Sequence, residues 1–156
     1  MPESAIQGAP ARRPVPPWTP CFLAWLLPGL GHIILGKRRT GLVFCAVVLA
    51  TFGLGVASDG TASLVDTHQP LTFLATFDNL AIGPIELLSR YVTYGRFVYR
   101  LPGEEGDPRQ TELMERVRRR IRSVTYEYGS TFLLTAGLMN MLLILDTFDI
   151  ATGRKD

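Results

Sequence analysis

The sequence has very few of the residues from which metal sites and nucleophilic active sites are built. It contains two cysteines, Cys21 and Cys45, and two histidines, His32 and His68, with neither a C-x-x-C nor an H-E-x-x-H pattern. Both cysteines lie in apolar runs, where an unpaired buried thiol is the ordinary expectation. No nucleophile with an orienting base and no glycine-rich phosphate loop is visible. We therefore expect a protein that is not an enzyme and that uses neither a metal nor a cofactor.

Positive charge is missing from the middle of the chain. No lysine or arginine occurs from Thr40 to Ser89, whereas nine of the sixteen lie from Arg90 to Arg122. The net charge of +2 hides this division. Residues 1–17 are rich in proline and alanine without apolar periodicity, which predicts a disordered tail. Arg12-Arg13 before an apolar run also occurs in signal peptides, but no small-x-small cleavage site follows, which favours an uncleaved anchor.

Four apolar segments follow the tail, at Trp18–Leu35, Gly41–Ala57, Leu71–Ser89 and Gly129–Ile150. As helices they would be roughly 25 to 33 Å long, close to the hydrocarbon thickness of about 30 Å. The sequence therefore predicts an all-α membrane protein. Its expected parts are a transmembrane hairpin at 18–57, a loop at 58–70, a third segment at 71–89, a polar cytoplasmic insert at 90–128, a last transmembrane helix at 129–150 and a tail at 151–156.

The expected hairpin turn is rich in glycine and positive charge, and small residues line the segment after it. Glycine permits a tight bend, and proline loosens a helix one or two turns before it. The turn residues are Pro28, Gly29, Gly31, His32, Gly36, Lys37, Arg38, Arg39 and Gly41. The small residues Ala46, Ala50, Gly53 and Ala57 recur at helical spacing, which predicts close packing against another helix.

The third segment contains polar residues that are expensive in lipid, among them Asp78, Asn79 and Glu86. It is therefore either a crossing, a broken or re-entrant segment, or a helix on the membrane surface. With four crossings, twelve basic residues lie on one side and four on the other; without the third crossing, the division is eleven to five. The positive-inside rule favours four crossings with both termini outside. An arginine of the insert is the usual partner for Asp78.

A short basic amphipathic helix is expected within the insert, at residues 108–124. Asp107 suits an N-cap, Pro108 the first helical position and Gln110 a capping box. Arginines surround its apolar stripe, at Arg116, Arg118, Arg119, Arg120 and Arg122. Such a helix fits the surface of a membrane with anionic headgroups. The alternative is a solvated helix whose apolar stripe packs on the protein itself; nucleic-acid binding is not expected.

The remaining candidate site residues are polar groups inside apolar segments. His32 is expected to bond a backbone carbonyl freed by Pro28 and the glycines. A metal site shared with His68 is not expected, because four crossings would put His68 on the other side of the membrane. Asn140, Asp146 and Asp149 form a polar edge on the last segment. Paired carboxylates perform acid–base chemistry in some proteins, but near a helix end they more often meet water or an arginine.

Two parts of the sequence resemble known families. Pro28-Gly29-x-Gly31-His32-x-x-Leu35-Gly36-Lys37-x-x-x-Gly41 resembles the hairpin of the TM-two domain family, although the aromatic residues after His32 and the Asp-Arg-Phe type of turn are absent. The stretch from Thr125 to Lys155 more closely resembles an uncharacterised family of small bacterial integral membrane proteins that joins this hairpin to a last helix. Its matching positions are Tyr126, Glu127, Tyr128, Gly129, Ala136, Gly137, Leu138, Asn140, Leu145, Asp146, Asp149, Ile150 and Gly153. The resemblance implies a multi-pass protein of the bacterial inner membrane.

Three functions are compatible with these features. The first is a non-enzymatic accessory, assembly or scaffold subunit that packs with partner membrane proteins. The second is a small transporter or proton-conducting or ion-conducting protein that uses Asp78, Glu86, Asp146 and His32. The third is a membrane enzyme with its site in the insert. The small-residue stripe and the lack of a catalytic set favour the first.

Overall fold

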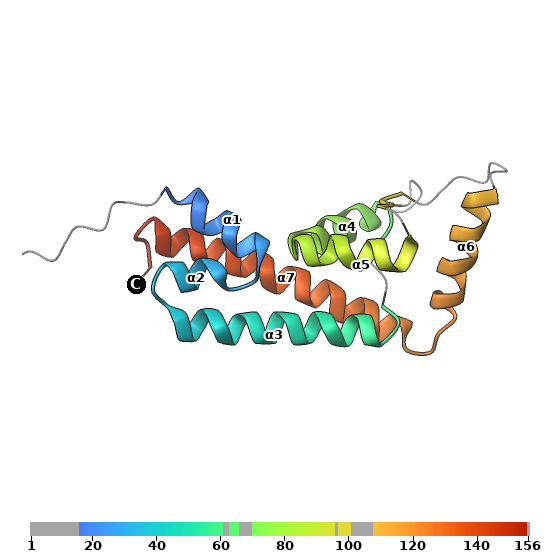
Figure 1. Cartoon of the computed structure of the whole chain (residues 1–156), viewed down its shortest axis with the longest axis horizontal. Helices are drawn as coiled ribbons and strands as arrows, with labels where there is room; N and C mark the ends of the chain where they lie inside the picture. Colours follow the sequence, from blue (N-terminus) through green and yellow to red (C-terminus); the bar gives the residue numbers. More distant parts are fainter. Residues whose placement is uncertain (1–15, 61–62, 66–69, 96, 101–107, 156) are drawn as a thin grey trace, which may run out of the picture.

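In the computed structural model, the described residues are 16–155 apart from 61–62, 66–69, 96 and 101–107. This part of the chain forms seven α-helices (Figure 1): α1 (Trp18–Leu26), α2 (Leu30–Ile34), α3 (Arg38–Ala57), α4 (Leu71–Ala81), α5 (Pro84–Tyr94), α6 (Pro108–Ile121) and α7 (Tyr126–Ala151). Its β-structure is one isolated bridge between Val65 and Arg100. The predicted all-helical class is confirmed. Residues 1–15 of the predicted tail, the proposed N-cap Asp107 and His68 lie outside the described residues.

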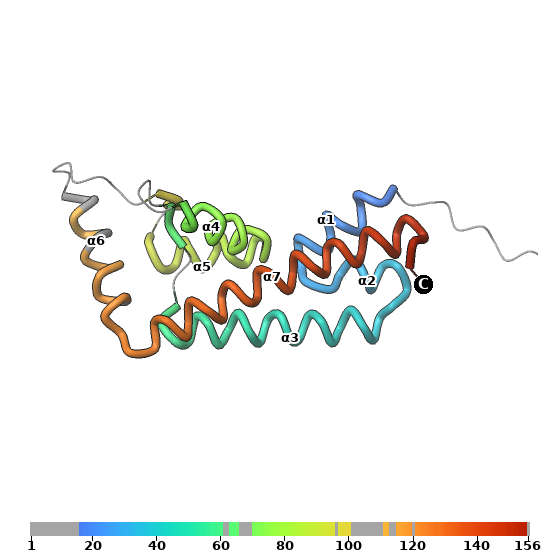
Figure 2. The backbone as a smooth tube through the Cα atoms, turned by 180° about the vertical axis from the view of Figure 1, so that it is seen from behind, coloured from blue at the N-terminus to red at the C-terminus, as the bar shows by residue number. Residues whose placement is uncertain are grey.

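The two longest helices, α3 and α7, run antiparallel side by side (Figures 1 and 2). They contain 20 and 26 residues, which correspond to about 30 and 39 Å. Each is long and apolar enough to cross a membrane. The apolar segments expected at 41–57 and 129–150 are therefore helices, and each helix begins three residues earlier than the apolar run alone indicated.

The first apolar segment does not form the single spanning helix that its length predicted. It is broken after Leu26, and α1 and α2 contain only nine and five residues. Leu27 has extended backbone angles and Gly29 has a φ of +81°. A side chain at Gly29 would collide with the carbonyl oxygen of Gly41, at the start of α3. The chain therefore reverses within this segment, well before the basic turn (Figure 1).

The third segment is also broken, as one of its sequence-based alternatives proposed. Helices α4 and α5 are bent by 117° at Ile82–Gly83, which is the geometry of a broken span or a re-entrant loop. Both arms of the bend reach Ser63, whose carbonyl oxygen accepts hydrogen bonds from the Thr76 hydroxyl at 3.0 Å and the Arg90 guanidinium at 3.2 Å. The two arms therefore form a hairpin whose open end lies beside the loop after α3.

The two helical hairpins, α1–α2 and α4–α5, meet tip to tip along α7 (Figure 2). The Trp25 indole nitrogen donates a hydrogen bond to the Leu80 carbonyl oxygen at 3.1 Å. Gly83, with a φ of +91°, lies so close to the Trp25 carbonyl oxygen that a side chain there would collide with it. The hairpins enter from opposite ends of the α3–α7 pair, and their tips meet part of the way along it.

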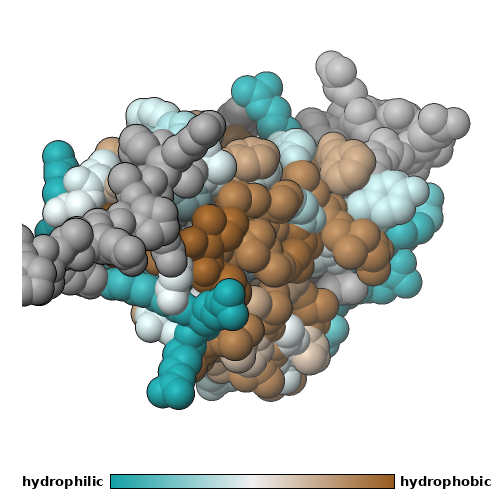
Figure 3. All heavy atoms as spheres, turned by 60° about the vertical axis from the view of Figure 1, so that its left-hand side comes forward, coloured by the Kyte–Doolittle hydropathy of each residue, from teal (hydrophilic) through white to brown (hydrophobic). Residues whose placement is uncertain are grey.

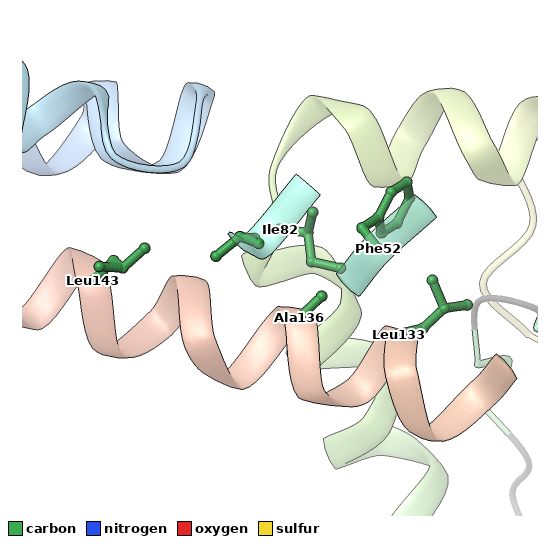
Figure 4. Close-up of a cluster of buried hydrophobic side chains, with 6 residues drawn as sticks. Phe52, Ile82, Leu133, Ala136 and Leu143 are labelled. Atoms are coloured by element: carbon green, nitrogen blue, oxygen red, sulfur yellow. The ribbon is translucent and has the colours of Figure 1, made fainter. Parts of the chain in front are cut away.

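A hydrophobic core joins α4–α5 to the long pair (Figure 4). Val48 and Phe52 come from α3, and Leu133 and Ala136 come from α7, with Ile82 from the α4–α5 bend between them. Residues at i and i+4 or i+3 share one helix face, which gives each long helix its buried stripe. This core fixes the bend of α4–α5 against the middle of the molecule.

The two basic regions lie at opposite ends of the long pair. The turn Lys37–Arg39 lies at the end where α7 finishes, whereas α6 lies beyond the end where α7 begins (Figure 1). The sequence-based expectation that the turn and α6 share one side is therefore not met, because the third segment turns back at Ile82–Gly83 instead of continuing. Four crossings are not confirmed, since the described residues contain two helices long and apolar enough to cross a membrane, or three if the bent pair α4–α5 counts as one span.

Candidate functional site

His32 connects the α1–α2 hairpin to α7 and is completely buried. Its Nε2 lies 2.8 Å from the Asp146 carboxylate, and its Nδ1 lies 3.2 Å from the Thr147 hydroxyl, which itself donates to the Leu143 carbonyl oxygen. The expected bond to a freed backbone carbonyl was therefore wrong. His32 uses both ring nitrogens on side chains of α7, and Gly31, packed against Thr147, permits the close approach.

The Asp146 carboxylate extends this cluster to the molecular surface. Its other oxygen accepts a hydrogen bond from the Lys155 ammonium at 2.5 Å, and this bond raises the pKa of Lys155. Asp149, the other predicted carboxylate, lies 3.9 Å from Arg154. The arrangement pairs each carboxylate with a cation near the end of α7, as is common for acidic residues at helix ends. Through its bond to His32, Asp146 also holds the α1–α2 hairpin against α7.

A second cluster, around Arg90, holds the open end of the α4–α5 hairpin. Arg90 is fully buried and donates two hydrogen bonds to one oxygen of Glu86, which is 1 % exposed. It also donates to the carbonyl oxygens of Ser63 and Val98 and lies 4.7 Å from the centre of the Tyr99 ring. Buried charges are tolerated when paired and hydrogen-bonded in this way. An arginine partner was predicted for Asp78, but the buried arginine is bonded to Glu86 instead.

Asp78, Asn79 and Asn140 form a third polar group, between α4 and α7. The Asn140 side-chain nitrogen donates to the Ala81 carbonyl oxygen at 2.7 Å. Asp78 faces Gly137, where even one added carbon would collide with its backbone and carboxylate oxygens. Neither oxygen of the Asp78 carboxylate has a hydrogen-bond partner within the described part of the chain, and the same holds for the Asn79 amide. This is the least satisfied polar group of the described structure.

The small-residue stripe of α3 lies on the outside. Ala46, Ala50, Gly53 and Ala57 are all exposed, and a side chain built at Gly53 would meet nothing within 4 Å. The helix packs on α7 through a different face, which contains Val48, Phe52 and Gly55. The stripe therefore makes no helix contact among the described residues. Figure 3 shows apolar residues covering the middle of one molecular face, with hydrophilic residues at its edges.

Helix α6 ends at Ile121, three residues short of the predicted end, so it carries four of the five predicted arginines and Arg122 follows directly after it. Arg116, Arg118, Arg119 and Arg122 are exposed, whereas the side chain of Arg120 lies outside the description. Arg116 forms an exposed ion pair with Glu112, four residues earlier. Val117, from the apolar stripe, packs with Leu64 and Tyr94. Part of the stripe therefore faces the protein itself, while the arginines face away.

Sequence reasoning missed several residues of these clusters. Arg90 was counted with the polar insert, although its spacing of four residues from Glu86 is a usable signal for a helical ion pair. Thr147 and Trp25 carried no such signal, because their partners come from distant parts of the sequence. Lys155 lies in the short tail and reaches back nine residues to Asp146.

Helices long enough to span a bilayer, broken hairpins and buried polar clusters together define the class of this protein: an all-helical protein with candidate membrane spans. The chain belongs to DUF6677, a family of unknown function, whose match covers residues 19–156. No curated protein and no solved structure matches the chain. The matched range includes both broken hairpins and α7.

Proposed function

We propose that the protein is a multi-pass component of the bacterial inner membrane with no catalytic role of its own, acting as an accessory or scaffold subunit for a partner membrane protein. The observation that carries this proposal is the uncovered stripe of small residues on α3. In lipid, helices associate through close van der Waals contact, and small residues permit that contact. The described chain uses the opposite face of α3 for its own packing, so the stripe is free for a second protein.

Gly53 provides a direct test of the stripe. Gly53→Leu is expected to weaken association with a partner by about 1–2 kcal/mol, because a large side chain keeps the helices apart. It should leave the monomer folded, since nothing lies within 4 Å of the added carbon. The measurement is the fraction of full-length protein that migrates as a larger complex on native gels after extraction in mild detergent.

Two neighbouring variants serve as controls. Leu54 is exposed beside the stripe, so Leu54→Ile should leave the complex intact. Gly55 faces Leu133 and the Gly129 carbonyl, so Gly55→Leu should unfold the monomer as well as remove the complex. Equal amounts of complex for Gly53→Leu and the unmodified protein would exclude this face of α3 as the interface.

The proposed membrane arrangement has two crossings, α3 and α7, and two hairpins that enter from opposite sides. It would place the N-terminal tail, the basic turn and the C-terminus on one side with seven basic residues, and the stretch from Arg90 to Arg122 on the other with nine. Because this division of basic residues is nearly even, the positive-inside rule does not clearly favour either orientation. The exposed arginines of α6 would then lie at a membrane surface, where we propose that they contact anionic headgroups.

Ion or proton conduction is the alternative function, and three of its four expected residues are engaged elsewhere. Glu86 is paired with Arg90, and Asp146 is paired with Lys155 and His32. These pairs lie at opposite ends of the long helices. Asp78 is the fourth residue of the set, and its buried, unpaired carboxylate suits the binding of an ion. This environment supports a binding site better than it supports a path across the membrane.

A further inference from the structure

Asp78 is a buried carboxylate without a counter-charge. It is 8 % exposed, and both of its carboxylate oxygens lack a donor within the described residues. On the α7 side it faces Gly137, in the middle of a helix whose backbone N–H groups are already used. An ionised carboxylate in such a place is expensive unless a proton or a cation compensates it. Arg90, the buried arginine of the same hairpin, is held by Glu86.

Two buried amide side chains lie near this carboxylate: Asn79 is the next residue of α4, and Asn140 reaches α4 from α7. Asn140 is fully buried and lies one turn beyond Gly137 on α7; Ala81, whose carbonyl it binds, lies one turn beyond Asp78 on α4. Because the Asn140 nitrogen is the donor in that bond, its oxygen must point elsewhere, and this oxygen has no donor within the described residues. The Asn79 amide, 2 % exposed, has no partner there either. Four buried side-chain oxygens of these residues therefore have no hydrogen-bond donor within the described residues, and the Asn79 side-chain nitrogen has no acceptor there.

The end of α4 makes the same region more negative. The helix stops at Ala81, just before the sharp bend at Ile82–Gly83, so the negative end of its dipole lies within the molecule. In broken membrane helices, such negative ends help to hold Na⁺. The last carbonyl oxygens of α4, at Asn79, Leu80 and Ala81, already accept hydrogen bonds, so the contribution of this helix end is its dipole. The bend is held open by the contact of Gly83 with Trp25, the tip-to-tip contact of the two hairpins.

We propose that Asp78, Asn79 and Asn140 form a binding site for one small monovalent cation of the Na⁺ type, between α4 and α7. A donor set made only of oxygens suits a hard cation. A single carboxylate neutralises a single positive charge, whereas a divalent ion would leave a net charge buried in an apolar environment. The bound ion would stabilise the bend of α4–α5 on α7, and this role is independent of any partner at α3.

The test is the response of thermal unfolding to sodium. Purified full-length protein in a non-ionic detergent is titrated with NaCl, and choline chloride keeps the ionic strength constant. At roughly a hundred times its Kd, Na⁺ should raise the melting temperature by about 5 °C. Asp78→Asn should remove this rise and still fold, because the amide has nearly the same shape and carries no buried charge. Glu127→Gln, a carboxylate change at an exposed position of α7, should retain it.

A second measurement covers the case in which Asp78→Asn fails to fold. Equilibrium dialysis with ²²Na⁺ should find one bound ion per chain, and Asn79→Ala should weaken this binding about tenfold. An unmodified protein that melts at the same temperature in sodium and in choline, or that binds no ²²Na⁺, would overturn the proposal. So would stabilisation by acid alone with no response to sodium, because the occupant of the site would then be a proton.

Discussion

Arg90 and Glu86 show how two charged residues are accommodated in a mostly apolar molecule. Both are almost fully buried, and the arginine also donates to two backbone carbonyl oxygens on separate loop segments, at Ser63 and Val98. Breaking such a pair from one side leaves the other charge uncompensated, which costs more than the intact pair contributes. Because separating the two charges costs free energy, the pair holds the open end of the α4–α5 hairpin in place.

Arg90→Met is accordingly expected to lower the free energy of unfolding by about 3 kcal/mol, because it leaves Glu86 buried without a cation. The double change Arg90→Met with Glu86→Leu should recover most of this loss. It should stay about 1 kcal/mol below the unmodified protein, because two carbonyl oxygens lose a donor. Chemical unfolding in detergent measures both. A single variant as stable as the unmodified protein would contradict the buried pair, and a double variant no better than the single one would contradict its energetic coupling.

For single residues, the sequence identified the unusual polar groups, but it did not identify the residues that they contact. Asp78, Asn79, Glu86 and Asn140 were all expected to be polar groups inside apolar segments, and all four are buried. The pairing of His32 with Asp146 joins residues 114 positions apart. No local pattern encodes such a contact, because it depends on the chain reversing at Gly29.

Glycines at the two hairpin tips determine the course of the helices. Gly29 and Gly83 both have a positive φ, and each lies against a backbone carbonyl of another helix or its flank. Any other residue there suffers both the strain of the left-handed region and a collision. Hydropathy alone cannot detect a reversal of this kind, because the apolar run continues through it. The same run of eighteen residues therefore suggested one helix where the chain forms two.

Gly83→Ala is expected to destabilise the protein by about 3 kcal/mol or more, since backbone strain and the collision with the Trp25 carbonyl add together. Gly153 provides the matched control. It has a φ of +71° after α7 but nothing within 4 Å, so Gly153→Ala should cost only about 1 kcal/mol from strain. Thermal unfolding of the two variants separates collision from strain. Equal losses would mean that the hairpin tips do not touch.

The whole molecule is an antiparallel pair of long helices with a short hairpin entering from each end. The sequence predicted the helical class, the last helix and the basic helix, because these depend on composition and local periodicity. It did not predict the arrangement of the ends, because the number of crossings depends on two bends. Each bend that returns the chain moves every later basic group to the other side. The basic turn and α6 therefore lie at opposite ends of the long pair (Figure 1).

Labelling from the two sides of the membrane tests this arrangement most directly. Single cysteines replace Arg38 and Arg119, both exposed, in full-length protein that lacks Cys21 and Cys45. A membrane-impermeant maleimide is applied to sealed vesicles of known orientation and then to opened ones. Because α4–α5 returns the chain, positions 38 and 119 are expected to be labelled from opposite sides. Labelling of both positions from the same side would contradict it.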